Sequence, residues 1–250
     1  MTTDPLVARA RALWQELAGE PVSFDPAGGV RVVVAPESRL CPRGWVGAVA
    51  IGGSVLVTAP DESVADAVGT AFCGLSVEAM VNPDTVAAML PVAERLGPAT
   101  LAYLSPAEFR PAVASGLVVE QLPAEHSDLR ELERSATAEE AGEAGLDGVT
   151  SPAFVVRIDG TVVAAAGYRG WPGRTAHVSI LTAPAWRGRG LGRAAASSAV
   201  AHALAEELLP QWRARPPASR RVASALGFRE LGAQLSWRPT GTVKLDEPEP

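Results

Sequence analysis

The chain has 250 residues, of which 47% are hydrophobic, so it holds enough apolar material for one large or two modest folded domains and is not a disordered chain. Its two cysteines exclude a disulfide framework, and its three histidines form no cluster with the spacing of metal ligands, so we expect no metal. The net charge of −6 is divided unevenly, because residues 1–150 carry −12 and residues 151–240 carry +8. The basic part suits an anionic cofactor.

The sequence shows no secretion signal and no membrane span. Its start lacks a basic region followed by an apolar stretch, and its longest strongly apolar run, residues 45–57, is too short to cross a bilayer. We also find no nucleic-acid-binding motif. We therefore expect a cytoplasmic protein that contacts neither membrane nor nucleic acid.

The first part of the chain predicts a mixed α/β domain without a chemical motif. Its elements are marked by apolar residues at helical spacing and by turn and capping residues. Gly52-Gly53 indicates a turn, Asn82-Pro83 the start of a helix and Gly97 the end of that helix. We expect helices over 5–18, 61–70 and 82–96, and strands over 30–35, 45–51, 54–58 and 99–104.

The second part predicts a strand over 117–122, an acidic helical region over 124–145 and a hairpin within 153–167. A strand over 175–183 follows, ended by Pro184, with Val178 and Ile180 on one face and His177 on the other. After a glycine-rich turn comes a helix of about four turns.

This strand, turn and helix predict an anion site. Gly188, Gly190 and Gly192 let the backbone turn tightly and approach a ligand, and the first helical turn presents unpaired N–H groups. Phosphate or pyrophosphate is the expected occupant. A dinucleotide fold would need an acidic residue ending a second strand about twenty positions later, and a Walker loop would need Gly-Lys-Ser/Thr; neither is present. A turn whose glycines only cap the helix stays open as an alternative.

Three segments together resemble the GCN5-related N-acetyltransferases (GNAT). Arg187-x-x-Gly190-x-Gly192 resembles the family's motif A, residues 219–230 resemble its second signature, and residues 153–167 look like its central hairpin. The resemblance implies a mixed, mostly antiparallel sheet flanked by helices, with an additional N-terminal α/β domain. We divide the chain into that N-terminal domain (1–110), a transferase domain (111–240) and an acidic tail (241–250).

The resemblance also implies the cofactor and its site. Acetyl-CoA would be the co-substrate, with its thioester carbonyl polarised by a backbone N–H near Leu181 or Thr182. The cofactor-binding residues are then expected to be Leu181, Thr182, Ala183, Arg187, Gly188, Arg189, Gly190, Leu191, Gly192 and Arg193.

His177 is the candidate catalytic base. It stands where relatives often place a water-relaying residue, and a histidine titrates near neutrality, so its replacement should flatten the pH dependence between about 6 and 8. A structural strand histidine is the alternative. The general acid is unassigned, because Ala223 stands where many relatives carry a tyrosine and Pro216 where an asparagine is often found.

The sequence thus predicts an N-acetyltransferase that moves acetyl directly to a primary amine of a small molecule or peptide in a ternary complex. The acidic residues of 124–145 are either a solvated face or the lining of a pocket for a cationic amine. A catalytically impaired acyl-CoA-binding module and a nucleotide-dependent oxidoreductase are the alternatives. The sequence does not identify the acceptor or the oligomeric state.

Overall fold

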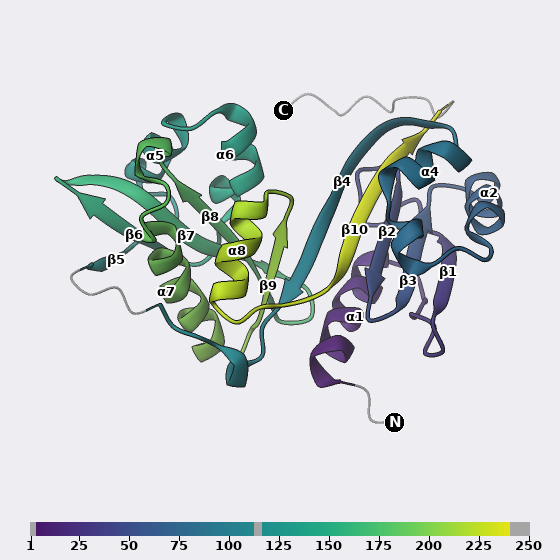
Figure 1. The fold of residues 1–250 in the computed structure, drawn as a ribbon, viewed down its shortest axis with the longest axis horizontal. Helices are drawn as coiled ribbons and strands as arrows, with labels where there is room; N and C mark the ends of the chain where they lie inside the picture. The colour runs from purple at the N-terminus through teal and green to yellow at the C-terminus, as the bar shows by residue number, and fades with distance from the viewer. Residues whose placement is uncertain (1–3, 113–116, 241–250) are drawn as a thin grey trace. The chain divides into compact units, whose positions relative to one another are not determined.

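A computed structural model of the chain describes residues 4–112 and 117–240. By their contacts these residues divide into two units, the first formed by residues up to Leu101 together with those from Glu230 onward, and the second by Ala102–Arg229 (Figure 1). The expected division at residues 110 and 111 stays a prediction, and the expected acidic tail lies outside the described residues.

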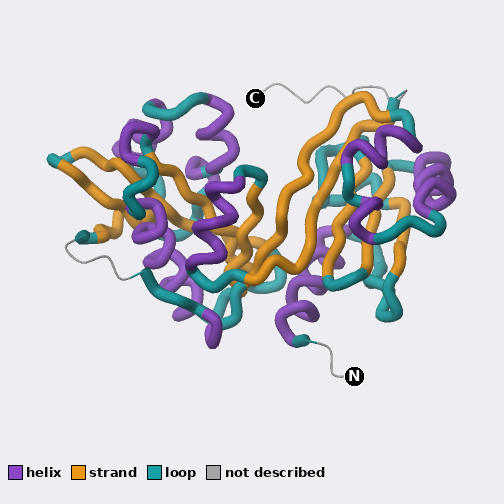
Figure 2. Tube along the Cα trace, viewed as in Figure 1, coloured by secondary structure: helices purple, strands orange, loops and turns teal. Residues whose placement is uncertain are grey.

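The first unit is a sheet with helices, as Figure 2 shows in strand and helix colours. Its strand order is β1-β3-β2-β10-β4, with β1 parallel to β3, and with β2 antiparallel to both β3 and β10. The elements are α1 (Pro5–Ala18), β1 (Gly29–Val34), β2 (Val46–Ile51), β3 (Ser54–Ala59), α2 (Glu62–Phe72), α3 (Val77–Met80), α4 (Pro83–Met89), β4 (Val92–Tyr103) and β10 (Arg229–Pro239).

The predicted helix over 82–96 is wrong in its second half. Asn82 caps α4 as expected, since its side chain accepts from the N–H groups of Asp84 and Thr85, but the helix ends at Met89 and strand β4 begins at Val92. The reason is Pro91, because a residue that precedes proline is driven out of the helical region. Leu90 accordingly has extended angles, φ −130° and ψ 148°.

The second unit holds the segments of the predicted transferase domain. Its strand order is β9-β8-β7-β6-β5, with antiparallel pairs throughout except for the parallel pair β8–β9. The elements are β5 (Val119–Leu122), α5 (Ser127–Arg134), α6 (Ala138–Ala144), β6 (Ala153–Ile158), β7 (Thr161–Trp171), β8 (Thr175–Thr182), α7 (Leu191–Ala205), β9 (Leu209–Ala214) and α8 (Pro217–Ala225), with short 3-10 helices η1 (Pro106–Glu108), η2 (Leu146–Gly148) and η3 (Pro184–Trp186).

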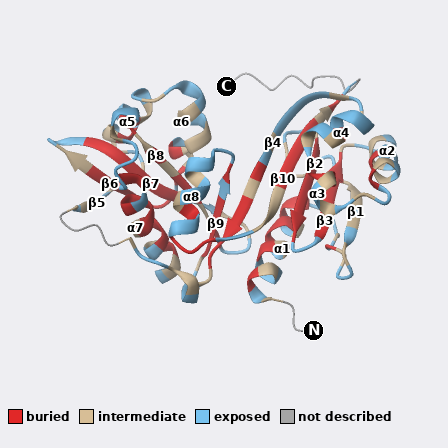
Figure 3. Ribbon diagram, viewed as in Figure 1, coloured by how far each residue is buried: buried red, intermediate tan, exposed pale blue. Residues whose placement is uncertain are grey.

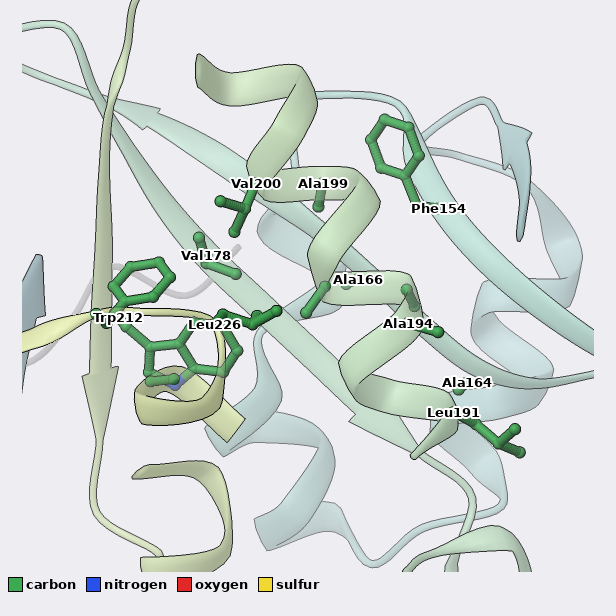
Figure 4. Close-up of a cluster of buried hydrophobic side chains, with 14 of the residues drawn as sticks. Phe154, Ala164, Ala166, Val178, Leu191, Ala194, Ala199, Val200, Trp212 and Leu226 are labelled. Atoms are coloured by element: carbon green, nitrogen blue, oxygen red, sulfur yellow. The ribbon is translucent and has the colours of Figure 1, made fainter. Parts of the chain in front are cut away.

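The sheet of the second unit is buried on both faces along β6 and β7, whose red segments Figure 3 shows. Successive side chains of a strand point to opposite faces. On one face Phe154, Ala166 and Val178 pack with α7 (Figure 4). On the other face Val155 and Leu181 pack with the α5 side chains Leu129 and Leu132. Helices therefore cover both faces.

Within the described residues, no helix is long and apolar enough to span a membrane.

Candidate functional site

The turn between β8 and α7 presents unpaired backbone donors. Gly190 caps α7 in the left-handed region (φ 77°) with no side-chain hydrogen bond, and the first N–H to find an acceptor within the helix is that of Ala194, which donates to Gly190 O (3.0 Å). The N–H groups of Leu191, Gly192 and Arg193 have no acceptor within the helix because of their position in its first turn. This helix of 15 residues thus starts with a site suited to an anion.

The three glycines of the turn have different roles. Gly188 and Gly190 lie at φ 78° and 77° with open space where a Cβ would stand. Gly192 has ordinary helical geometry, but a Cβ on it would lie 2.5 Å from Thr182 Oγ1 and 3.2 Å from Ile180 Cδ1. Gly188 and Gly190 thus permit the turn, whereas Gly192 permits close packing of α7 on β8.

One edge of β8 becomes open towards its end. Among the described residues the parallel register with β9 runs from Thr175–Leu209 to His177–Gln211 and ends there. Ala183 N–H donates to Val163 O of β7, whereas Arg174 O accepts from Leu209 N–H of β9. Because backbone groups alternate between the two edges of a strand, Ile180 and Thr182 direct their N–H groups to the open edge and Leu181 does not.

Two of the three turn arginines contact other parts of the unit. Arg187 donates through Nε to Thr182 O (3.1 Å) and through Nη1 to Glu140 Oε1 of α6 (2.6 Å). The Arg187 guanidinium is the main reason that the pKa of the Glu140 carboxyl is lowered to about 2. The Arg189 guanidinium lies over the ring of Trp186 at 4.6 Å from its centroid, and Arg193 is exposed.

His177 is partly buried between two side chains. Its ring stacks on Trp171 with 4.3 Å between centroids and 16° between planes, and its Nδ1 donates to Gln211 Oε1 (2.5 Å). Nδ1 therefore carries the proton, and Nε2 keeps its lone pair.

The expected titration of His177 near neutrality is wrong. Burial, followed by the charge of Arg213, lowers its pKa to about 4, and the hydrogen bond to Gln211 only partly opposes this. The ring is therefore neutral throughout the range from pH 6 to 8. It can accept a hydrogen bond through Nε2 and carries no charge in that range.

Comparison with known proteins identifies this region. Residues 151–233 match the family model described as GNAT acetyltransferase. Residues 151–233 are thus similar to the GNAT family, and we call them the GNAT region. The mixed, mostly antiparallel sheet with flanking helices predicted for this GNAT region is confirmed, as is the additional α/β part.

Solved structures similar to this chain include a GCN5-related N-acetyltransferase from Kribbella flavida (16% identity, 64% of this chain, 63% of that chain, TM-score 0.44). Another is a GCN5-related N-acetyltransferase-like protein from Streptococcus suis (14% identity, 93% of this chain, 98% of that chain, TM-score 0.47). A third is yncA, a putative acetyltransferase from Salmonella typhimurium, with its cofactor acetyl-CoA (18% identity, 53% of this chain, 99% of that chain, TM-score 0.37). The chain spans 65%, 63% and 59% of the length of three solved chains that it matches. Comparison with curated proteins gives no match.

The GNAT region offers no tyrosine at the position expected for a general acid. Ala223 is buried in the core and Pro216 precedes α8. Tyr168 donates or accepts a hydrogen bond with His202 Nδ1 (2.9 Å) and packs with Ala176 and Ala203, so it faces α7.

Two of the three acidic residues of α6 bind arginines. Glu140 pairs with Arg187, as described above, and Glu143 pairs with Arg215, which follows β9. The Glu140 and Glu143 carboxylates are therefore part of the link between α6 and the ends of β8 and β9. This arrangement does not support the interpretation that they line a pocket for a cationic amine.

A separate cavity of about 360 Å³ lies between α5, the start of β7 and η3. Its lining includes Asp128, Glu131, Val162 and Trp186, and of the expected cofactor residues it includes only Ala183. Asp128 is bound to Arg157 (2.6 Å).

Sequence reasoning missed Gln211, Arg169 and Arg213 as neighbours of His177. Gln211 is fully buried on β9, and Arg169 is the register partner of His177 on β7. Gln211 could have been noticed in the sequence as a polar residue among the apolar residues of segment 209–214. Its position beside His177, however, follows only from the parallel register of β8 and β9.

Proposed function

We propose that this chain is an acetyl-CoA-dependent N-acetyltransferase that moves an acetyl group directly to a primary amine. The observation that carries the proposal is the combination of an open β8 edge and the donor-rich start of α7. An extended thioester arm can pair with the first as an added strand would, and a pyrophosphate can bind the second. The family of residues 151–233 supports the same assignment.

The proposed cofactor site uses the predicted residues in distinct ways. The backbone N–H groups of Gly188–Arg193 would bind the pyrophosphate, with charge from the turn arginines. Thr182 N–H, directed to the open edge, would polarise the thioester carbonyl. Leu181 would contribute only packing, since its backbone is directed to β7 and its side chain is buried with α5.

The reaction needs a neutral amine next to the thioester. The amine nitrogen attacks the carbonyl carbon, the new N–C bond forms, the C–S bond breaks, and the amine proton is transferred to the thiolate or to water. His177 precedes Thr182 by five residues on β8, about 16 Å along the strand, so its Nε2 would act on the amine through ordered water. Acetyl-CoA supplies the activated acetyl group.

Direct transfer is supported by the state of the two cysteines. Covalent transfer needs an activated nucleophile, most often a thiolate. Burial raises the pKa of the Cys41 thiol to about 12, and its Sγ donates to Trp45 O (3.4 Å). Cys73 is exposed at the end of α2, and both cysteines belong to the first unit.

Thermal unfolding with acetyl-CoA, propionyl-CoA, NAD and ATP tests the cofactor. We expect acetyl-CoA at 100 times its Kd to stabilise the protein by about 2.7 kcal/mol. Gly190→Asp should abolish this stabilisation, because a carboxylate would stand where the pyrophosphate binds. Gly74→Asp is the matched control, since Gly74 has the same backbone geometry (φ 76°) and the same open surroundings outside the site.

Three outcomes distinguish the possibilities. Equal shifts by acetyl-CoA in wild type and Gly190→Asp would reject the site. Stabilisation by NAD alone would indicate an oxidoreductase. Stabilisation by acetyl-CoA without acetylation of any amine in a broad panel would indicate an acyl-CoA-binding module, in line with the missing acid at Ala223.

A further inference from the structure

A row of side chains crosses three strands on the α6 face of the second unit. Arg169 of β7, His177 of β8 and Gln211 of β9 are consecutive register partners, so their side chains lie next to one another on one face. The Ser179 hydroxyl, two residues beyond His177, donates to Gly145 O at the end of α6, which identifies that face. The Arg169 guanidinium lies beside η2, with Nη1 3.6 Å from where a Cβ on Gly148 would stand.

This face is positively charged around His177. Arg213 lies two residues beyond Gln211 and so on the same side of β9. After burial, the charges of Arg213 and Arg169 lower the pKa of His177, whereas Glu143 raises it with a weaker effect. Glu143 itself is bound to Arg215. The imidazole is therefore surrounded by more positive than negative charge.

A second observation indicates a ligand at this row. Gln211 is fully buried, its Oε1 accepts from His177, and its Nε2 has no hydrogen-bond partner among the described residues. A buried amide that lacks a partner is costly, so such groups are often completed by water or a ligand. Its two N–H groups add donors to a row that already has a guanidinium, and the acceptors left in the row are His177 Nε2 and the second lone pair of Gln211 Oε1.

We infer that the acceptor is an amine that also carries an anionic group such as a carboxylate, held by Arg169 while the amino group is linked to His177 through ordered water. The inference rests on the proposed function. A guanidinium matches a carboxylate with two parallel hydrogen bonds. The surrounding positive charge disfavours a dication such as a diamine, and it favours loss of the proton from the bound ammonium. The site would then promote formation of the nucleophile without a side chain that titrates near neutrality.

Matched pairs of acceptors test the inference with the full-length protein and acetyl-CoA. Each pair is an amino acid and its decarboxylated amine, such as phenylalanine with phenethylamine and leucine with isopentylamine, and spermidine is added as a polycation. We expect the amino acid of each pair to have a kcat/KM about ten- to a hundredfold higher, the range given by a charged hydrogen bond. Arg169→Gln should remove this preference mainly through KM, and Arg169→Lys should restore part of it.

The control is Arg174→Gln. Arg174 is another exposed arginine of the β7–β8 hairpin, but it pairs with Glu207 (3.6 Å) and is not part of the row. This substitution should leave the preference unchanged. Equal or better use of the decarboxylated amines or spermidine would overturn the inference while leaving the proposed function intact. Acetylation of none of the compounds would overturn both.

Discussion

At the scale of single residues, His177 links the stability of the protein to pH. Its folded pKa of about 4 lies below the ordinary value of 6.5, so between these values the unfolded chain binds a proton that the folded chain does not. Stability from the neutral ring is therefore complete above pH 6.5 and is lost as the pH falls towards 4. In His177→Asn an amide N–H can still donate to Gln211, but nothing titrates.

We expect the stability advantage of wild type over His177→Asn to decrease by about 3 kcal/mol between pH 7 and pH 4, measured by urea unfolding. From pH 6 to 8 the activity profiles of both proteins should have the same shape. A stability difference that stays constant with pH, or a wild-type inflection near neutrality that disappears in the variant, would contradict this account.

The sequence could predict the position of His177 but not its pKa. Alternation along 175–182 places the ring on one face of the strand, whereas its pKa depends on Gln211 and Arg213, thirty-four or more residues away in the chain. Such neighbours follow from the β8–β9 register, which no local pattern contains.

The two cysteines provide a second prediction at this scale. Because Cys41 holds its proton firmly and Cys73 is exposed outside the GNAT region, neither is set up as a nucleophile. Replacing both by serine should leave turnover within a few-fold of wild type. Mass spectrometry of protein incubated with acetyl-CoA alone should show no acetyl adduct on either cysteine; an adduct together with parallel initial-rate lines would establish a covalent route.

At the scale of elements, α6 holds Arg187, an arginine of the turn that we propose binds the cofactor. Glu140 belongs to a capping box with Thr137 at the start of α6, and its carboxylate holds the Arg187 guanidinium (2.6 Å). We expect Glu140→Gln to weaken acetyl-CoA binding about two- to fivefold, as for loss of an exposed ion pair that orients a binding group. Binding of pantetheine, which lacks the pyrophosphate, should be unchanged.

The neighbouring substitution Glu139→Gln serves as the control, because Glu139 is exposed on the same helix and does not bind Arg187. Isothermal titration of the three proteins measures the effect. If Glu140→Gln bound acetyl-CoA as wild type does, or more tightly, then the ion pair would not be orienting Arg187 for the cofactor.

The elements themselves were predictable where the local signals were consistent. The helix over 5–18, the hairpin about Gly52-Gly53 and the strand before the glycine turn are confirmed, because periodicity and turn residues agree there. The helix predicted over 82–96 ends early, at Met89, because Pro91 drives Leu90 out of the helical region. We had used Gly97 as the signal for the end of that helix. The glycine turn was recognised, but the packing role of Gly192 required the distance to Thr182.

At the scale of the whole molecule, the sequence does not show where the second unit begins and ends. The family signatures lie within 151–233, yet the core packed against α7 also contains Ala102 and Leu104. Leu104 N–H donates to Pro210 O (3.2 Å) in β9, and Arg110 N–H donates to Leu226 O (3.0 Å) after α8. These long-range contacts carry no local sequence signal.

A comparison of two fragments tests how this stretch contributes to the second unit. A fragment of residues 102–229 keeps Leu104, its hydrogen bond to Pro210 and that of Arg110 to Leu226, whereas a fragment of residues 112–240 loses them. Deletion of one buried leucine side chain alone typically costs about 2–5 kcal/mol. We therefore expect the fragment of residues 102–229 to be more stable than the other by at least about 3 kcal/mol, and to bind acetyl-CoA. Thermal unfolding with and without acetyl-CoA measures both properties, with the full chain as reference. Equal melting temperatures and equal acetyl-CoA shifts for the two fragments would show that the chain before residue 112 is dispensable for the unit and would favour the division predicted at residues 110 and 111.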